Sequence, residues 1–129
     1  MFSFSNKNQK IAVIGSGYWG SIIINTLIEL RFKNIVVYDK SIKNKKIAKN
    51  KFNIINIENS FSNILNDKNI LNIFVVTPPS ENLSIVKKLI FNDKNIFLEK
   101  PGFSSVKDIK IIENYLKKSK SKLMFGYIY

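Results

Sequence analysis

Hydrophobic residues along the chain follow two alternating patterns. Short, nearly continuous apolar runs predict strands buried on both faces, whereas apolar positions three and four residues apart predict amphipathic helices. The expected strands cover residues 11–14, 35–38, 52–57, 72–76, 95–98 and 122–129. The expected helices cover residues 18–31 and 41–49, and three more begin at Ser60, Ser80 and Ser104 or Ser105. This alternation indicates an α/β domain with a doubly wound parallel sheet of strand order 3-2-1-4-5-6.

Side-chain chemistry supports several of these boundaries. The first helix presents an apolar face formed by Ile23, Ile24, Leu27, Ile28 and Leu30. Pro78 and Pro79 end the fourth strand, because proline lacks the backbone N–H that a strand donates to its neighbour. Ser80 is the expected cap of the next helix, and Ser105 with Asp108 resembles a capping box.

The most specific motif is Gly15-Ser16-Gly17-Tyr18-Trp19-Gly20, between the first strand and the first helix. A strand, a Gly-x-Gly-x-x-Gly turn and a helix form a dinucleotide-binding fingerprint, so we expect these six residues to bind a cofactor. Gly15 permits a sharp turn, Gly17 a close approach to the pyrophosphate, and Gly20 close helix packing. The helix directs free N–H groups at the pyrophosphate. A glycine-rich turn without a ligand is the alternative, which this context disfavours.

Asp39 ends the second expected strand, nineteen residues after Gly20. A carboxylate there accepts hydrogen bonds from the adenosine ribose and repels a 2′-phosphate, which favours NAD over NADP. Lys40 and Lys43 act against this preference, because a nearby cation offsets part of the repulsion. An aspartate at a strand end also forms turns without any ligand, but the spacing from the glycines favours the cofactor interpretation.

Composition limits the range of functions. The chain has 129 residues, enough for one domain, and contains no cysteine and no histidine. We therefore expect no metal site, and the commonest general base is excluded. The first ten residues lack the apolar core of a signal peptide, and no apolar run approaches the roughly 20 residues of a membrane helix. A soluble, cytoplasmic protein is expected.

The formal net charge of +12 suggests anionic partners. However, 20 of the 21 basic residues are lysine and only Arg31 is arginine, whereas recognition of bases favours arginine. The lysines are spread along the chain, with a denser stretch in residues 40–51, and the abundance of lysine, asparagine and isoleucine suggests an A- and T-rich coding bias. We expect solvated lysines and no nucleic-acid partner.

Two further motifs lie where expected strands leave the sheet. Thr77-Pro78-Pro79 follows the fourth strand and Glu99-Lys100-Pro101 follows the fifth. Such folds bind ligands at the strand ends beside the switch point. A lysine before proline is held extended, which would aim the Lys100 ammonium at the crevice. Each motif alone is an ordinary turn, but together they are specific in a domain with this glycine motif.

With these motifs, the chain resembles the N-terminal half of the Gfo/Idh/MocA oxidoreductases, named for glucose–fructose oxidoreductase, inositol dehydrogenase and a rhizopine catabolism protein. The resemblance covers residues 10–129 and rests on the glycine motif, Asp39, Thr77-Pro78-Pro79 and Glu99-Lys100-Pro101 in the family's order. The end of the glycine motif, Gly17-Tyr18-Trp19-Gly20, and the final Gly126-Tyr127-Ile128-Tyr129 are similar to members that act on nucleotide sugars. The resemblance implies an NAD-binding Rossmann domain that serves hydride transfer between nicotinamide and a secondary hydroxyl of a sugar, nucleotide sugar or cyclitol.

The resemblance also implies roles for individual residues. Lys100 is the expected catalytic residue, which orients the hydroxyl, stabilises the developing alkoxide and helps to move the proton. Glu99 is expected at the nicotinamide ribose, Thr77 and Pro78 in the cofactor bed, and the Lys100–Pro101 bond in the cis form. Asn82 stands where many relatives have histidine; it keeps hydrogen bonding in the cofactor site but cannot carry a proton.

Length separates the chain from its relatives, which continue into a second α+β domain that supplies most substrate contacts. We interpret residues 1–129 as the dinucleotide-binding domain, a fragment that lacks this substrate domain. The full-length enzyme is expected to be a homo-oligomer. A non-catalytic NAD(H)-binding module, or the remnant of a truncated gene, is the alternative. A methyltransferase with a similar glycine turn would leave Glu99-Lys100-Pro101 without a role.

Overall fold

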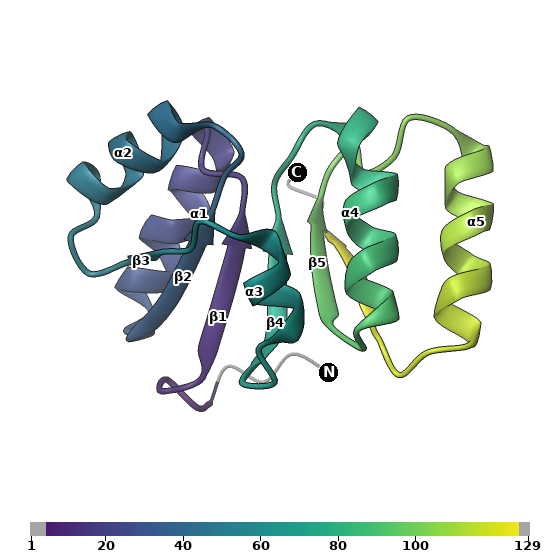
Figure 1. Ribbon diagram of the computed structural model, residues 1–129, viewed down its shortest axis with the longest axis horizontal. Helices are drawn as coiled ribbons and strands as arrows, with labels where there is room; N and C mark the ends of the chain where they lie inside the picture. The colour runs from purple at the N-terminus through teal and green to yellow at the C-terminus, as the bar shows by residue number, and fades with distance from the viewer. Residues whose placement is uncertain (1–4, 127–129) are drawn as a thin grey trace.

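The strands form one parallel sheet, so their carboxyl ends meet at a single edge (Figure 1). The computed structural model describes residues 5–126. The strand order is β3-β2-β1-β4-β5-β6, which confirms the doubly wound prediction. The strands are β1 (Lys10–Ile14), β2 (Asn34–Tyr38), β3 (Asn56–Ile57), β4 (Ile70–Val75), β5 (Asn95–Glu99) and β6 (Leu123–Gly126). The expected extension of the last strand, with the terminal Tyr-Ile-Tyr, lies outside the described residues.

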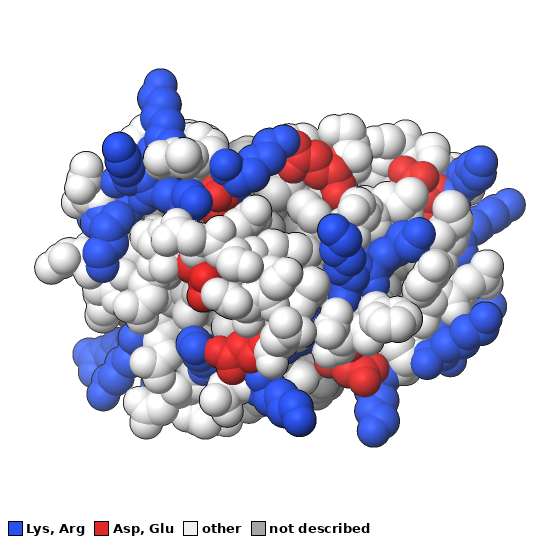
Figure 2. Space-filling model, in the orientation of Figure 1, with Lys and Arg blue, Asp and Glu red and all other residues white. Residues whose placement is uncertain are grey.

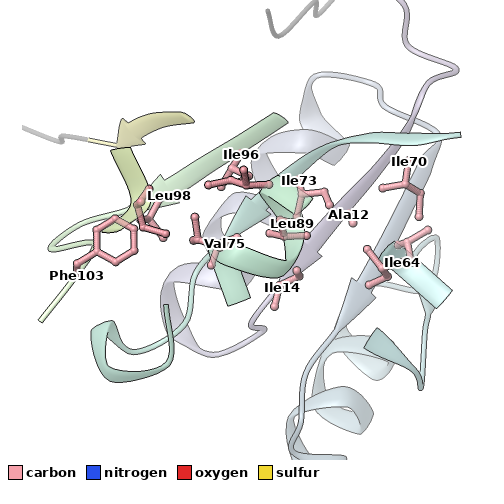
Figure 3. Packing of buried hydrophobic residues seen from close by; sticks show 14 residues of the cluster. Ala12, Ile14, Ile64, Ile70, Ile73, Val75, Leu89, Ile96, Leu98 and Phe103 are labelled. Atoms are coloured by element: carbon pink, nitrogen blue, oxygen red, sulfur yellow. The ribbon is translucent and has the colours of Figure 1, made fainter. Parts of the chain in front are cut away.

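Helices cover both faces of this sheet. They are α1 (Tyr18–Glu29), α2 (Ile42–Lys51), α3 (Phe61–Asn66), α4 (Pro79–Phe91) and α5 (Val106–Lys117). Successive β1 residues point to opposite faces. Ile11 and Val13 therefore pack in a core with α1 and α2, while Ala12 and Ile14 pack in a core with α3, α4 and α5. Figure 3 shows the second core, where residues of β1, β4 and β5 surround Leu89 of α4.

The start of α4 differs from the prediction. Ser80 is the second residue of the helix, and Pro78 takes the N-cap position with Pro79 as the first helical residue. Proline suits this place because its φ is already helical and the N–H that it lacks would have no partner inside the helix. The prediction of Ser80 as the cap is therefore wrong. At α5 the Ser105 part of the predicted capping box is confirmed, because the Ser105 hydroxyl accepts a hydrogen bond from the Asp108 N–H at 3.2 Å.

β3 is also shorter than predicted, because residues 52–55 use their backbone groups elsewhere. The Phe52 N–H donates to Ala48 at the end of α2, and the Ile55 N–H donates to the Phe52 carbonyl in a turn. Phe52 and Ile55 are nevertheless buried in the core. Burial accounts for the strand-like apolar pattern at these positions.

Two side chains do not play the local role expected of them. Leu30 is 48% exposed, because α1 ends one residue before it, although Ile24 and Leu27 of the same helix are buried as predicted. Ser60 stands at the N-cap of α3, but its side chain makes no capping hydrogen bond. Its backbone N–H instead donates to the Glu58 carboxylate at 3.0 Å. The carboxylate thus binds the backbone N–H of the N-cap residue, while the Asn63 N–H of the first turn donates to the Ser60 carbonyl at 3.2 Å.

Basic side chains are distributed over the surface. On the face drawn in Figure 2, lysine and arginine side chains lie around most of the outline, with fewer aspartate and glutamate side chains between them. The charge on this face is therefore not gathered in one stripe. In the part of the chain that the structure describes, no helix has the length and hydrophobicity needed to span a membrane.

Candidate functional site

A cleft of about 800 Å³ lies at the carboxyl edge of the sheet. Its walls come from the turn after β1, the segments that follow β2 and β4, the first turns of α4, and the end of β5. Ten of the twelve expected site residues line it: Gly15, Gly17, Tyr18, Trp19, Gly20, Asp39, Thr77, Pro78, Glu99 and Lys100. The fold therefore brings together motifs that are up to 85 residues apart in the sequence (positions 15 and 100).

The three glycines of the turn have different surroundings. Gly15 has φ +97°, and a Cβ there would lie 2.4 Å from the Val76 carbonyl oxygen. A Cβ on Gly20 would lie 2.0 Å from the Gly15 oxygen. A Cβ on Gly17, by contrast, would have no atom within 4 Å, although this residue lines the cleft. The protein's own packing requires glycine at the first and last positions, whereas the middle position opens onto free space.

The N-terminus of α1 adjoins this free space. Gly17 is its N-cap, no side chain caps it, and its first turn contains no acidic residue. The first N–H groups and the positive end of the helix dipole are therefore available to an anion. Tyr18 and Trp19 at the same helix start are 77% and 48% exposed. Exposed aromatic side chains beside a cleft are suited to contact with a ligand.

Asp39 is buried and is held by hydrogen bonds from three residues. One carboxylate oxygen accepts from the Ser16 N–H at 2.9 Å, the Ser16 hydroxyl at 3.2 Å and the Asn44 amide at 3.2 Å. The other accepts from the Ser41 N–H at 2.8 Å. Ser16 is not in the lining of this cleft, and it orients Asp39; with Gly17 and Tyr18 it lines a second cavity of about 570 Å³.

These hydrogen bonds also determine the charge of Asp39. Burial raises the pKa of the carboxyl, but the donors from Ser16, Ser41 and Asn44 outweigh burial and hold the pKa below its ordinary value. Asp39 is therefore ionised at neutral pH. Its ionised form stabilises the folded chain, and this contribution is lost as the pH falls through the lowered pKa.

Asn82 occupies a different place from the one expected. It is fully buried and is not part of the cleft lining. Its amide oxygen accepts from the Thr77 hydroxyl at 2.5 Å, and its amide nitrogen donates to the Gly102 carbonyl at 2.5 Å. Asn82 therefore joins the segments that carry the two strand-end motifs. The Lys100–Pro101 bond, inside the second of these motifs, is cis, as the resemblance implies.

Several lining residues were not predicted from the sequence. They are Ile14, Tyr38, Lys40, Ser41, Asn44, Phe61, Val76, Glu81, Ser84, Ile85 and Lys88. At one end of the cleft the Tyr38 and Phe61 rings are 5.7 Å apart, and the Lys88 ammonium is 5.9 Å from the Phe61 ring. Lys40 forms an ion pair with Glu81. Lys40 was singled out from the sequence, because it adjoins Asp39. Phe61 comes from α3, and Glu81, Ser84, Ile85 and Lys88 come from α4, so these five depend on how the two helices pack.

Comparison with known proteins agrees with the site. A family model described as an oxidoreductase family with an NAD-binding Rossmann fold matches residues 9–127. Glutamyl-tRNA reductase of Caldivirga maquilingensis is 30% identical to this chain over an alignment 129 residues long. The alignment covers 91% of this chain and 31% of the reductase.

Solved structures share the fold at low identity. The WlbA dehydrogenase of Bordetella pertussis, in complex with NADH and UDP-GlcNAcA, has a TM-score of 0.80 and 15% identity over 92% of this chain and 35% of that one. Biliverdin reductase of Synechocystis sp. PCC 6803, in complex with biliverdin and NADP+, has a TM-score of 0.80 and 17% identity over 92% and 37%. The chain spans about a third of the length of these proteins.

Proposed function

Because the chain belongs to the Gfo/Idh/MocA oxidoreductases through its NAD-binding Rossmann domain, we propose that it forms the cofactor-binding half of a dehydrogenase. The reaction proposed is hydride transfer between nicotinamide and a secondary hydroxyl of a sugar, nucleotide sugar or cyclitol. The observation that carries this proposal is the cleft, in which the glycine turn, Asp39 and both strand-end motifs meet. The open space beside Gly17 fits a cofactor pyrophosphate, because no protein atom uses it.

Each part of the cleft has a role in this proposal. Gly17 and the free N–H groups of α1 hold the pyrophosphate, while Asp39 accepts hydrogen bonds from the adenosine ribose. Thr77 and Pro78 form the bed of the cofactor, and Glu99 contacts the nicotinamide ribose. When bound, the nicotinamide supplies the hydride chemistry.

Lys100 is the proposed catalytic residue, because it lines the cleft and is the cation of the second strand-end motif. Its ammonium would orient the substrate hydroxyl, stabilise the developing alkoxide and help to move the proton. Asn82 is proposed as a positioning residue, since its side chain holds the Thr77 hydroxyl and the Gly102 carbonyl. An asparagine cannot exchange a proton, so acid–base work is assigned to Lys100.

The substrate class rests on similarity alone. WlbA, which has the same fold, was solved with the nucleotide sugar UDP-GlcNAcA, whereas biliverdin reductase shares the fold and binds a different kind of molecule. A sugar-type substrate is therefore the proposal, and no nucleic-acid partner is proposed. A non-catalytic NAD(H)-binding module is the alternative, favoured by the completeness of the cofactor cleft within this chain.

Turnover tests the half-enzyme proposal. We expect residues 1–129, mixed with NAD⁺ and UDP-GlcNAcA or simple sugars, to form no NADH above the background rate. In the family, the second domain holds the substrate against the nicotinamide, and proximity with orientation accounts for roughly 7–11 kcal/mol of a reaction barrier. Absorbance of NADH measures the rate. Steady NADH formation that disappears in Lys100→Ala would contradict the proposal, because it would place a whole active site in this chain.

Cofactor preference tests the role of Asp39. NADH should bind more tightly than NADPH, and Asp39→Asn should narrow this difference about tenfold, or about 1.4 kcal/mol, by removing the charge that repels a 2′-phosphate. Asparagine keeps the size of the side chain and one acceptor oxygen, so one of the Ser16 and Ser41 N–H groups loses its acceptor, whereas Asp39→Ala removes the acceptors of both. Calorimetric titrations give the constants, with Glu113→Gln on exposed α5 as the control. Equal affinities in the unchanged chain would refute this role.

A further inference from the structure

Two residues of the cleft lining form an ion pair. The Lys40 ammonium, directly after β2 and Asp39, meets the carboxylate of Glu81 in the first turn of α4. Both residues line the cleft, and their side chains are 72% and 27% exposed. The hydrogen bond and the charge of Glu81 raise the pKa of Lys40. Lys40 is therefore a full cation whose charge is met by a carboxylate.

The position of this pair matters for a phosphorylated ribose. In the proposed site Asp39 holds the ribose hydroxyls, so a 2′-phosphate would lie beside Asp39 and its neighbour Lys40. A free lysine ammonium there would attract the phosphate and offset the repulsion from Asp39. Paired with Glu81, the ammonium has its charge neutralised and one of its three donors occupied.

Other cations near the cleft are arranged differently. Lys88 also lines it, but its ammonium lies over the Phe61 ring, at the end formed with Tyr38. Lys43, in the first turn of α2, does not belong to the lining. Lys40 is thus the lining cation next to Asp39 in sequence, and the carboxylate paired with it comes from a distant part of the chain.

We propose that Glu81 is a specificity-determining residue, which favours NAD over NADP by holding and neutralising Lys40. This inference rests on the proposed dinucleotide site. It makes Glu81 the second carboxylate, after Asp39, that favours NAD over NADP. Asp39 repels the 2′-phosphate directly, whereas Glu81 withholds the cation that would bind it. Selection against NADP then depends on α4 as well as on the end of β2.

A double-mutant cycle tests the inference by binding rather than by activity. Dissociation constants of NADH and NADPH are measured by calorimetry for the unchanged chain, Glu81→Gln, Lys40→Gln and the double variant. Glu81→Gln should tighten NADPH binding about three- to fivefold, the upper part of the range for an exposed ion pair, and change NADH binding less than twofold. Lys40→Gln alone should not tighten NADPH binding, because it removes the cation and leaves the Glu81 carboxylate unpaired in the cleft lining. In the double variant the gain for NADPH should vanish, because the released cation is gone.

Salt and a matched control separate this effect from general charge. The gain in Glu81→Gln should shrink as the salt concentration rises to about 1 M, where the screening length is about 3 Å. Glu113→Gln, the same change on α5 outside the cleft, should leave the NADPH constant unchanged. A gain that persists in the double variant would overturn the inference, because Glu81 would then act on the phosphate without Lys40. If Glu81→Gln binds NADPH as the unchanged chain does and still binds NADH, the inference about Glu81 is overturned, while the proposed dinucleotide site is not. Failure of the unchanged chain to bind NADH would remove the proposed site as well.

Discussion

Gly17→Val is expected to abolish measurable NADH binding while leaving the fold intact. Gly17 has φ −69°, which any residue adopts, and a Cβ there meets no protein atom within 4 Å. The Cβ of valine would therefore have room in the protein, and the side chain would occupy the space proposed for the pyrophosphate. We expect NADH binding to weaken at least about 100-fold, or about 2.8 kcal/mol. Stability should fall by no more than about 1 kcal/mol, the usual scale of replacing an N-cap residue.

Two measurements on the same variant check this prediction. Calorimetric titration gives the NADH dissociation constant, and urea denaturation gives the free energy of unfolding. Gly17→Ala should have an intermediate effect on binding, because its side chain is smaller. A folded Gly17→Val chain that binds NADH as well as the unchanged chain would show that the pyrophosphate does not lie beside this turn.

Gly20→Val should have the opposite profile, with a large loss of stability. The ideal Cβ lies 2.0 Å from the Gly15 oxygen and 2.8 Å from the Gly15 carbonyl carbon, both of them backbone atoms. No side-chain rotation relieves such contacts, so α1 would have to move away from the turn. Overpacking typically costs about 1–3 kcal/mol and sometimes more, and we expect more than about 3 kcal/mol here. The free energy of unfolding of a domain is only about 5–15 kcal/mol in total, so the variant would lose a large part of its stability.

The matched control is the same substitution three residues earlier. Urea denaturation of Gly20→Val and Gly17→Val compares two valines in one turn, one against backbone atoms and one in open space. Equal free energies of unfolding in the two variants would contradict the packing described for α1. This pair therefore separates the structural glycine from the glycine assigned to the ligand.

Much of the fold could be predicted from the sequence, because parallel strands buried on both faces leave a clear pattern. Apolar runs such as residues 11–14 predicted strands at their correct places, and the glycine turn placed the site at the sheet edge. The wrong predictions concern residues whose type suits one local role but which have another role in the structure. Phe52 and Ile55 are as apolar as strand residues but end a helix and form a turn. Ser80 looked like a cap, but two prolines already began the helix.

The candidate site was predictable where its residues sit in one motif, and less so where tertiary packing brings residues in. The lining by Lys100 and Asp39 follows from their places at strand ends. Ser16 and Asn82 are absent from the lining of this cleft and hold Asp39 and Thr77 by hydrogen bonds, so their contact with a cofactor stays a prediction. Phe61 enters the cleft because α3 packs beside β2, and no local pattern marks such a contact.

Titration of NADH into the chain, followed by the fluorescence of Trp19, measures directly whether the cleft binds a dinucleotide. Trp19 is the single tryptophan of the sequence and lines the cleft beside the glycine turn. A bound nicotinamide cofactor would quench its emission and accept its excitation energy. We expect a saturable decrease at one site per chain, which is absent in Gly17→Val. A decrease that only grows in proportion to NADH concentration, equally in both chains, would contradict the claim that this cleft binds a dinucleotide.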